Sequence, residues 1–227
     1  MTMGQLVRKP PCLFLTLGSL LFVFAQTAAA DTNYVSLTGN GTPPYTSWVT
    51  AATNIQDAVA VAAEGNTVLV ADGVYTSAVA VTSVFDSVAY RAMVMVTNGI
   101  TIRSVNGATN TIVSRVGAVN FRIVFLNHTN AVLDGFTIVN GRDSDVQGGG
   151  GVYCSNGLAQ NCIVSTNTTD GGAATAGGGG VKCVGNGVVR DSLINGNYSG
   201  GHAGGGGVWC GSSGLVQNCT ITGNTGG

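Results

Sequence analysis

The densest group of carboxylates in the 227-residue sequence is Asp143-Ser144-Asp145, which directly follows Arg142. Carboxylate oxygens are ligands that Ca²⁺ prefers, so Asp143 and Asp145 form a candidate calcium loop. The alternative, which we favour, is that both are solvated loop charges. The spacing of the other Asp, Glu, His and Cys residues indicates no metal centre and no further cofactor site.

Hydrolysis of a glycosidic bond needs two carboxyl groups held about 5–9.5 Å apart, and the sequence offers few candidates for such a pair. Asp134 or Gly135, Asn161, Asp191 and Asn218 occupy corresponding places in successive sequence units. One Asp among amides does not make a catalytic pair. We therefore assign no catalytic residue.

Five cysteines follow residue 30, and their spacing divides them into two sets. Cys154, Cys183 and Cys210 recur at intervals of 29 and 27 residues, and Cys162 and Cys219 form the second set. None has the CxxC spacing typical of a zinc site. We expect a packed ladder of thiols that behave as small apolar side chains. A disulfide within the first set is the alternative, because stacked strands bring Cα atoms within about 4.4–6.8 Å.

These residues belong to a sequence repeat with two elements in each unit. Four glycines followed by Val, a variable residue and Cys occur as residues 148–154, 177–183 and 204–210. The second element ends in Asn167, Asn197 and Asn224. Glycine and asparagine suit corners where the backbone takes a positive φ.

Side chains alternate along a strand, which separates the three residues after each glycine block into two faces. The constant Val and Cys positions predict an inward column, and the variable middle position predicts an outward one. The outward column is a candidate ligand-facing surface, since exposed aromatic rings suit contact with a glycan or another partner. The predicted inward valines are Val152, Val181 and Val208, and the predicted outward residues are Tyr153, Lys182 and Trp209.

Composition supports a repetitive β-structure. Glycine supplies 36 of the 227 residues and charged side chains only 8%, which excludes a coiled coil, a charged disordered chain and a nucleic-acid binder. Units this short and this rich in Gly, Asn, Thr and Val are poor helix formers and must stack to bury their apolar faces. The sequence predicts an all-β, right-handed parallel β-helix of about six coils.

The front of the chain predicts a cap for this solenoid. Residues 53–63 predict a short helix, because Ile55, Ala58, Val59 and Ala62 recur at helical spacing, with Gly65 as its C-terminal breaker. We expect a cap region over residues 31–66 and a β-helix over residues 67–227 that is incomplete at its C-terminal end. Its first strands are expected at residues 67–71, 74–76, 92–96, 100–104, 111–115, 121–126 and 131–133.

Residues 1–30 have the pattern of a secretory signal peptide. Arg8 and Lys9 precede an apolar run at residues 13–25, and small residues at 27–30 suit cleavage. The run is shorter than the ~20 residues of a transmembrane helix. We expect a secreted or cell-surface protein, associated with an outer membrane, whose mature chain has no transmembrane segment and a net charge of −3.

The stretch from Asn54 to Tyr75 resembles the first coil of right-handed parallel β-helix proteins with the pectin-lyase-like fold. Residues 98–104 and 133–138 resemble its next coils. The glycine blocks, paired with Ile194-x-x-Asn197 and Ile221-x-x-Asn224, are similar to the repeats of polymorphic outer-membrane proteins. The resemblance covers roughly residues 50–227. It implies the fold and leaves the activity open, because this fold serves lyases, hydrolases and adhesins alike.

Two functions of different classes follow from these observations. The first is an exported, noncatalytic β-helix that acts as an adhesive or structural module and contacts an extracellular polysaccharide or a cell-surface partner. The second is the N-terminal part of a polysaccharide lyase or glycoside hydrolase whose active coils lie further along the chain. The lack of an acid–base set in the sequence favours the first function. A packing scaffold without a ligand is a third alternative.

Overall fold

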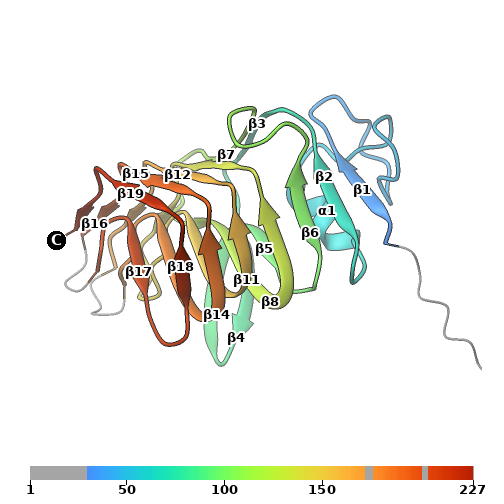
Figure 1. Cartoon of the computed structure of the whole chain (residues 1–227). Coiled ribbons are helices and arrows are strands. Elements are labelled where there is room, and N and C mark those ends of the chain that lie inside the picture. Colours follow the sequence, from blue (N-terminus) through green and yellow to red (C-terminus); the bar gives the residue numbers. More distant parts are fainter. Residues whose placement is uncertain (1–29, 172–175, 201–203, 227) are drawn as a thin grey trace, which may run out of the picture.

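The computed structural model describes residues 30–171, 176–200 and 204–226, which form a parallel β-solenoid of about five turns. The sequence predicted about six. Successive turns stack side by side from β1 (Thr32–Val35) to β20 (Thr225–Gly226), as Figure 1 shows. The predicted signal peptide lies outside the described residues except for Ala30.

One long sheet, here called sheet A, runs the length of the solenoid. The main part of this sheet is a series of parallel strands, each of which pairs with the strand of the next turn. In spatial order these strands are β1, β2 (Thr67–Val70), β6 (Thr101–Ser104), β8 (Arg122–Asp134), β11 (Val152–Gln160), β14 (Val181–Arg190) and β17 (Val208–Cys210). β18 (Leu215–Gln217) pairs with β14, and β5 (Val88–Val96) pairs with β8.

Two further sheets complete the later turns, whereas the earlier turns in the described part of the chain have no strand in the third sheet. Sheet B contains β3 (Gly73–Ser77), β7 (Thr111–Arg115), β9 (Thr137–Val139), β12 (Ile163–Ser165), β15 (Leu193–Asn195) and β19 (Thr220–Thr222). Sheet C contains β10 (Arg142–Asp143), β13 (Thr168–Thr169), β16 (Tyr198–Ser199) and β20. The apolar core lies between the three sheets.

The register of the strands confirms the predicted repeat. Val152 pairs with Val181 and Val181 with Val208, while Cys154, Cys183 and Cys210 align in the same way. Val152, Val181, Cys154 and Cys183 are buried in the main core, and Val208 packs against it.

A short helix lies near the N-terminal end of the stacked turns, where one was predicted. The N-cap residue of α1 (Ile55–Val61) is Asn54, whose side-chain oxygen accepts a hydrogen bond from the Asp57 backbone N–H at 2.9 Å. Ile55, Ala58 and Val59 are buried, and the helix packs against β1, β2 and β5. The role predicted for Gly65 is wrong: the helix ends at Val61, and Gly65 makes a separate turn with φ +84°.

Each of the later turns places an asparagine inside the corner between sheets B and C. The Oδ1 atom of Asn197 accepts hydrogen bonds from the backbone N and the Nδ2 of Asn167, both at 3.0 Å. The Nδ2 atom of Asn197 donates to Asn224 Oδ1 and to the Val164 carbonyl, both at 2.9 Å. The three asparagines therefore form a continuous ladder that satisfies buried backbone groups where the chain turns.

The glycine blocks lie directly against this asparagine ladder. A Cβ atom at Gly151, Gly180 or Gly207 would come within 2.7–2.8 Å of the Nδ2 of the asparagine in the same turn. A Cβ at Gly179 would lie 2.0 Å from the Tyr198 carbonyl oxygen. The predicted positive φ applies to Gly148, Gly149 and Gly178. The other glycines of the blocks are required by close contact rather than by backbone conformation.

Replacing Asn197 by Ala should lower the free energy of unfolding by about 3 kcal/mol or more, because several buried donors and acceptors lose their partner. Urea unfolding of the variant and the wild type measures the difference. The matched control is Asn186→Ala, which removes a single exposed amide contact to Asn156 and should change stability by about 0.5 kcal/mol or less. Equal losses in the two variants would contradict a stabilising role for the ladder.

Candidate functional site

The predicted outward column exists, but it is not an exposed surface. Phe125, Tyr153, Lys182 and Trp209 align on successive strands of sheet A, on the face opposite the main core. Tyr153 is only 7% exposed and Lys182 only 5%. The expectation that these two side chains face a ligand is therefore wrong in this structure, and only Trp209 is partly exposed.

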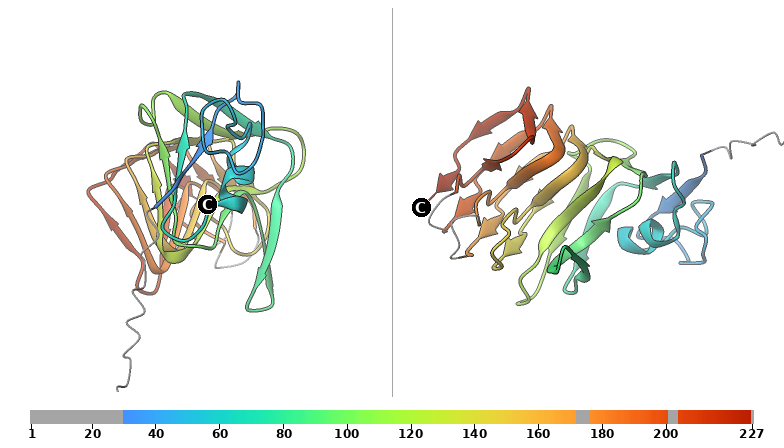
Figure 2. Two further views of the ribbon diagram at one scale, coloured as in Figure 1. Left: turned by 90° about the vertical axis from the view of Figure 1, so that its right-hand side faces the viewer. Right: turned by 90° about the horizontal axis from the view of Figure 1, so that it is seen from below.

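An aromatic hairpin covers one end of this column. β4 (Val81–Phe85) and β5 form an antiparallel pair that stands beside the stacked turns, as Figure 2 shows. It places Phe85 against Phe125 and Tyr90 against Tyr153, with ring centroids 5.5 and 5.4 Å apart. The hairpin was not predicted from the sequence. Its signal is Asp86-Ser87, whose φ values of +50° and +65° form the tight turn between alternating strands.

The glycine loops cover the rest of the column. A Cβ at Gly149 would lie 3.0 Å from the Cβ of Lys182, and a Cβ at Gly177 would lie 2.5 Å from Trp209 Cδ1. The Lys182 ammonium lies 4.5 Å from the centroid of the Trp209 ring and 5.6 Å from that of Tyr153. Lys182 is therefore held between two aromatic rings under a glycine-rich loop.

Asp143 of the candidate calcium loop is buried in an ion pair. Its Oδ1 accepts a hydrogen bond from Arg122 Nη2 at 2.8 Å, and its Oδ2 accepts one from the Gly148 backbone at 2.9 Å. Arg122 is fully buried and also lies 5.3 Å from the Tyr153 ring centroid. The interpretation of Asp143 as a solvated loop charge is wrong, because the loop folds back over β8.

Asp145 also has an arginine partner. Arg91 on β5 donates from Nη2 to both of its carboxylate oxygens, at 3.0 and 3.1 Å. The loop thus connects the hairpin and β8 to the glycine block through two ion pairs. Within the described residues, no group of three or more His, Cys, Asp or Glu side chains is placed to hold a metal ion. Calcium binding by Asp143 and Asp145 stays a prediction.

Burial changes the acidity of the groups around this ion pair. Burial raises the pKa of Asp143 to about 6, against the opposing effect of Arg122. Burial lowers the pKa of Lys182 to about 8, and Arg122 lowers it further. The pKa of Tyr153 is raised above its ordinary value, mainly by burial. Perturbed groups of this kind suit acid–base chemistry, but here they are enclosed and do not face a polymer-sized cleft.

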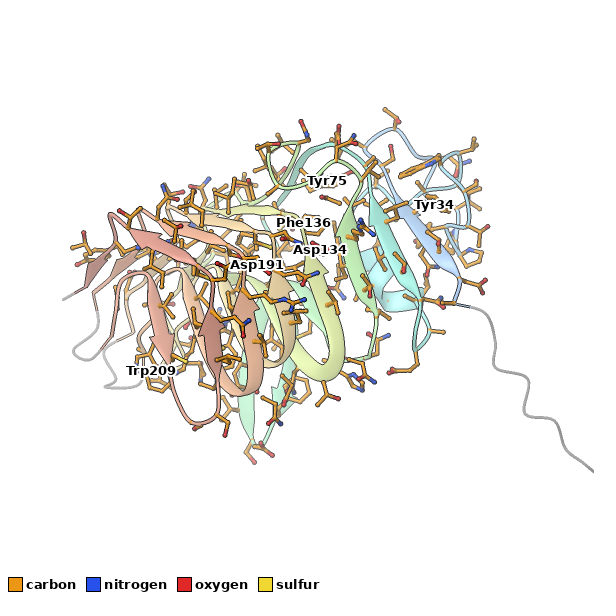
Figure 3. The ribbon with its side chains drawn as sticks, in the orientation of Figure 1. Tyr34, Tyr75, Asp134, Phe136, Asp191 and Trp209 are labelled. Carbon is orange, nitrogen blue, oxygen red and sulfur yellow. The ribbon has the colours of Figure 1, made fainter. Side chains whose placement is uncertain are left out.

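Of the carboxylates considered for a catalytic pair, Asp134 is the last residue of β8, and Asp191 lies in the turn that follows β14 (Figure 3). Asp134 pairs in register with Gln160, so Gly135 rather than Asp134 corresponds to Asn161 and Asp191. Asp134 accepts a hydrogen bond from Asn161 at 2.7 Å, and Asn218 donates one to Asp191. The two carboxylates therefore belong to different columns, and each is bound by the amide of the following turn.

The cysteines form the predicted ladder of free thiols in the described residues. Cys154 and Cys183 are buried, whereas Cys210 is exposed at the last turn described. The Sγ atoms of Cys183 and Cys210 donate to the carbonyls of Gly187 and Gly214, at 3.1 and 3.0 Å. Burial raises the pKa of Cys162 to about 11, which keeps this thiol protonated and unreactive.

A surface groove that was not predicted lies at the corner of sheets B and C. It has a volume of about 560 Å³ and is lined by Arg115, Asn140, Arg142, Thr168, Asp170 and Tyr198. These residues come from consecutive turns, and neighbouring members of the set are 2 to 28 positions apart along the chain. The two-residue strands of sheet C are too short to give an alternating pattern.

Comparison with protein-family models, curated proteins and solved structures finds no match for this chain. The class of the protein is therefore defined by its fold, a parallel β-solenoid with glycine and asparagine ladders. Over the described residues, no helix has the length and apolar character needed to cross a bilayer.

Lys182 should contribute increasing stability between pH 8 and pH 10.5, its folded and ordinary pKa values. In this range the folded state binds fewer protons at Lys182 than the unfolded state does, so this side chain favours folding as the pH rises, by up to about 3 kcal/mol. The buried thiols, whose pKa values are raised, act in the opposite direction in both proteins, so urea unfolding across this range should show the effect of Lys182 as a growing difference between the wild type and Lys182→Met. Parallel pH profiles for the two proteins would contradict the prediction. Lys9 is the one other lysine, so the Lys182 Cε resonance can be followed directly.

Alkylation under native conditions should label Cys210 first, Cys219 more slowly, and Cys154, Cys162 and Cys183 only on unfolding. The order follows from exposure, because a buried thiol needs local opening before it reacts. Peptide mass spectrometry after timed quenching measures the rates. Rapid labelling of Cys183 in the folded chain, or its recovery as a disulfide with Cys210, would contradict the free-thiol ladder.

Proposed function

We propose that this protein is an exported, noncatalytic β-helix that acts as an adhesive or structural module at the cell surface or outside the cell. Its ligand would be an extracellular polysaccharide or a cell-surface partner, and it would work without a cofactor. We also propose that the chain is related to pectin-lyase-like proteins and to proteins with polymorphic outer-membrane-protein repeats, which its sequence resembles. The signal-peptide pattern of residues 1–30 supports export.

The observation that carries the proposal is the burial of the groups that could perform acid–base chemistry. Arg122, Asp143 and Lys182 are 0%, 1% and 5% exposed. A general acid or base must come within hydrogen-bonding distance of its substrate, and a polysaccharide chain does not reach these atoms while the hairpin and the glycine loops are in place. Their contacts support a packing role, in which they join the hairpin to sheet A.

The exposed faces of the solenoid support a role in contact. Asp134, Gln160, Arg190 and Gln217 align on successive strands of sheet A. Arg190 donates to Gln160 Oε1 from Nε and Nη2, at 3.0 and 2.7 Å. Such a ladder is a flat, hydrogen-bonded polar surface that repeats along the axis. Solenoids characteristically use extended surfaces of this type for binding.

The full chain should bind to surfaces coated with polysaccharide or to intact cells, and it should release no sugar from pectin, alginate or chondroitin, with or without Ca²⁺. Surface plasmon resonance and a reducing-end assay measure the two results. Asp143→Asn and Lys182→Met should bind as the wild type does, because both side chains are buried. Sugar release that either variant abolishes would overturn the proposal and favour a lyase or hydrolase.

A further inference from the structure

Strand β4 of the aromatic hairpin has one edge without a strand partner. In the described part of the chain β4 pairs with β5 alone, and the hairpin projects away from the stacked turns (Figure 2). The two-residue turn at Asp86-Ser87 makes Phe85 and Val88 a hydrogen-bonded pair, and such pairs alternate along an antiparallel ladder. Thr82 and Val84 therefore direct their backbone N–H and C=O groups to the free edge.

This free edge is open and uncharged. Within the described residues, no hydrogen bond reaches the backbone of Thr82 or Val84 from outside the hairpin. Both residues are exposed, and Val84 is 64% exposed. The strand reads Val-Thr-Ser-Val-Phe, so it lacks the Lys, Pro or inward-pointing charge with which natural sheets protect an exposed edge. A strand of this kind is a template for pairing with another strand.

A groove beside this edge leaves room for the end of an added strand. It has a volume of about 340 Å³ and lies between α1 and the first residues of β4. Three helix residues line one side and three strand residues the other: Gln56, Val59 and Ala60 on α1, and Val81, Thr82 and Ser83 on β4. All the residues that line the groove are uncharged. The groove therefore suits a strand as free of charge as β4 itself.

The sequence of β4 is complementary to itself. Antiparallel pairing of two copies about a two-fold axis at Ser83 places Thr82 opposite the partner's Val84, and Val81 opposite the partner's Phe85. Apart from the central serines, the opposed side chains are β-branched or aromatic, which are favourable cross-strand pairs, and no like charges meet. Because Thr82 and Val84 both face the free edge, this register also supplies the backbone hydrogen bonds that they lack.

We propose that two copies of this chain associate through β4, so that their hairpins form one continuous four-stranded antiparallel sheet. The far end of each β4 lies in the groove beside α1 of the other copy. The pairing uses the one free edge of each hairpin, so it closes at a dimer and does not continue into a fibre. Two short strands make a small interface, so the dimer dissociates reversibly. The inference goes beyond the proposed adhesive function, to which a dimer would add avidity.

Sedimentation velocity of the full chain over a range of concentrations tests the dimer. We expect a reversible monomer–dimer equilibrium without larger species. Val84→Lys should weaken the association at least about tenfold, because it places a charge on the edge that pairs with the partner. Val74→Lys is the matched control, since Val74 is 52% exposed on β3 of sheet B, and it should associate as the wild type does. A wild type that stays monomeric, or equal association of the two variants, would overturn the proposal.

Oxidative cross-linking tests the register. At the two-fold axis the Cβ atoms of the two Ser83 residues would lie about 4.5–5.5 Å apart, so cysteines at this position can form a disulfide. The experiment uses diamide and a chain that carries Cys12→Ser, Cys210→Ser and Cys219→Ser. In that chain Ser83→Cys should give a covalent dimer, and Thr82→Cys should give it at least about ten times more slowly, because position 82 does not face itself. Equal rates, or no covalent dimer from Ser83→Cys, would overturn the pairing.

Discussion

The contact between the glycine blocks and the asparagine ladder is the constraint on which the rest of the solenoid depends. The Asn197 side chain bonds backbone groups of its own turn and of the preceding turn, and it donates to the Asn224 side chain of the next turn, so one side chain fixes both the corner and the stacking distance. Gly180 must lack a Cβ because that asparagine lies against it. The two motifs of the repeat are therefore two sides of one contact, which explains why they occur together in each unit.

The same close approach brings the glycine loops over the outer face of sheet A, where they enclose the column of Tyr153 and Lys182. The charged side chains on this face, Arg122, Asp143 and Lys182, are buried rather than solvated. Asp143 pairs with Arg122, and Lys182 lies between aromatic rings. A buried ion pair stabilises the folded state little more than apolar side chains of similar volume would. Its contribution here is to fix the loop and the hairpin in one arrangement.

The parts of the fold that arise from local periodicity were predictable from the sequence. The spacing of Cys154 and Cys183 indicated the register of sheet A, and Ile55 and Ala58 indicated the helix, because both patterns repeat within one element. The exposure of Lys182 was not predictable in this way. It is decided by the loop at Gly149, from the preceding turn, and by the rings of Tyr153 and Trp209 on the neighbouring strands. The groove escaped prediction because Arg115, Arg142 and Tyr198 come together only when four turns are stacked.

The contrast between the two outer faces follows from what covers each of them. On sheet A, the hairpin and the glycine loops exclude solvent, so variable residues such as Tyr153 become a second core. On sheet C, the inward positions are Asp143, Thr169 and Ser199, all buried, and nothing in the described chain lies over the outward residues Arg142 and Tyr198. The same backbone repeat thus gives a covered outer face on sheet A and an open outer face on sheet C. On the open face, side chains can change from turn to turn without disturbing the ladder beneath them.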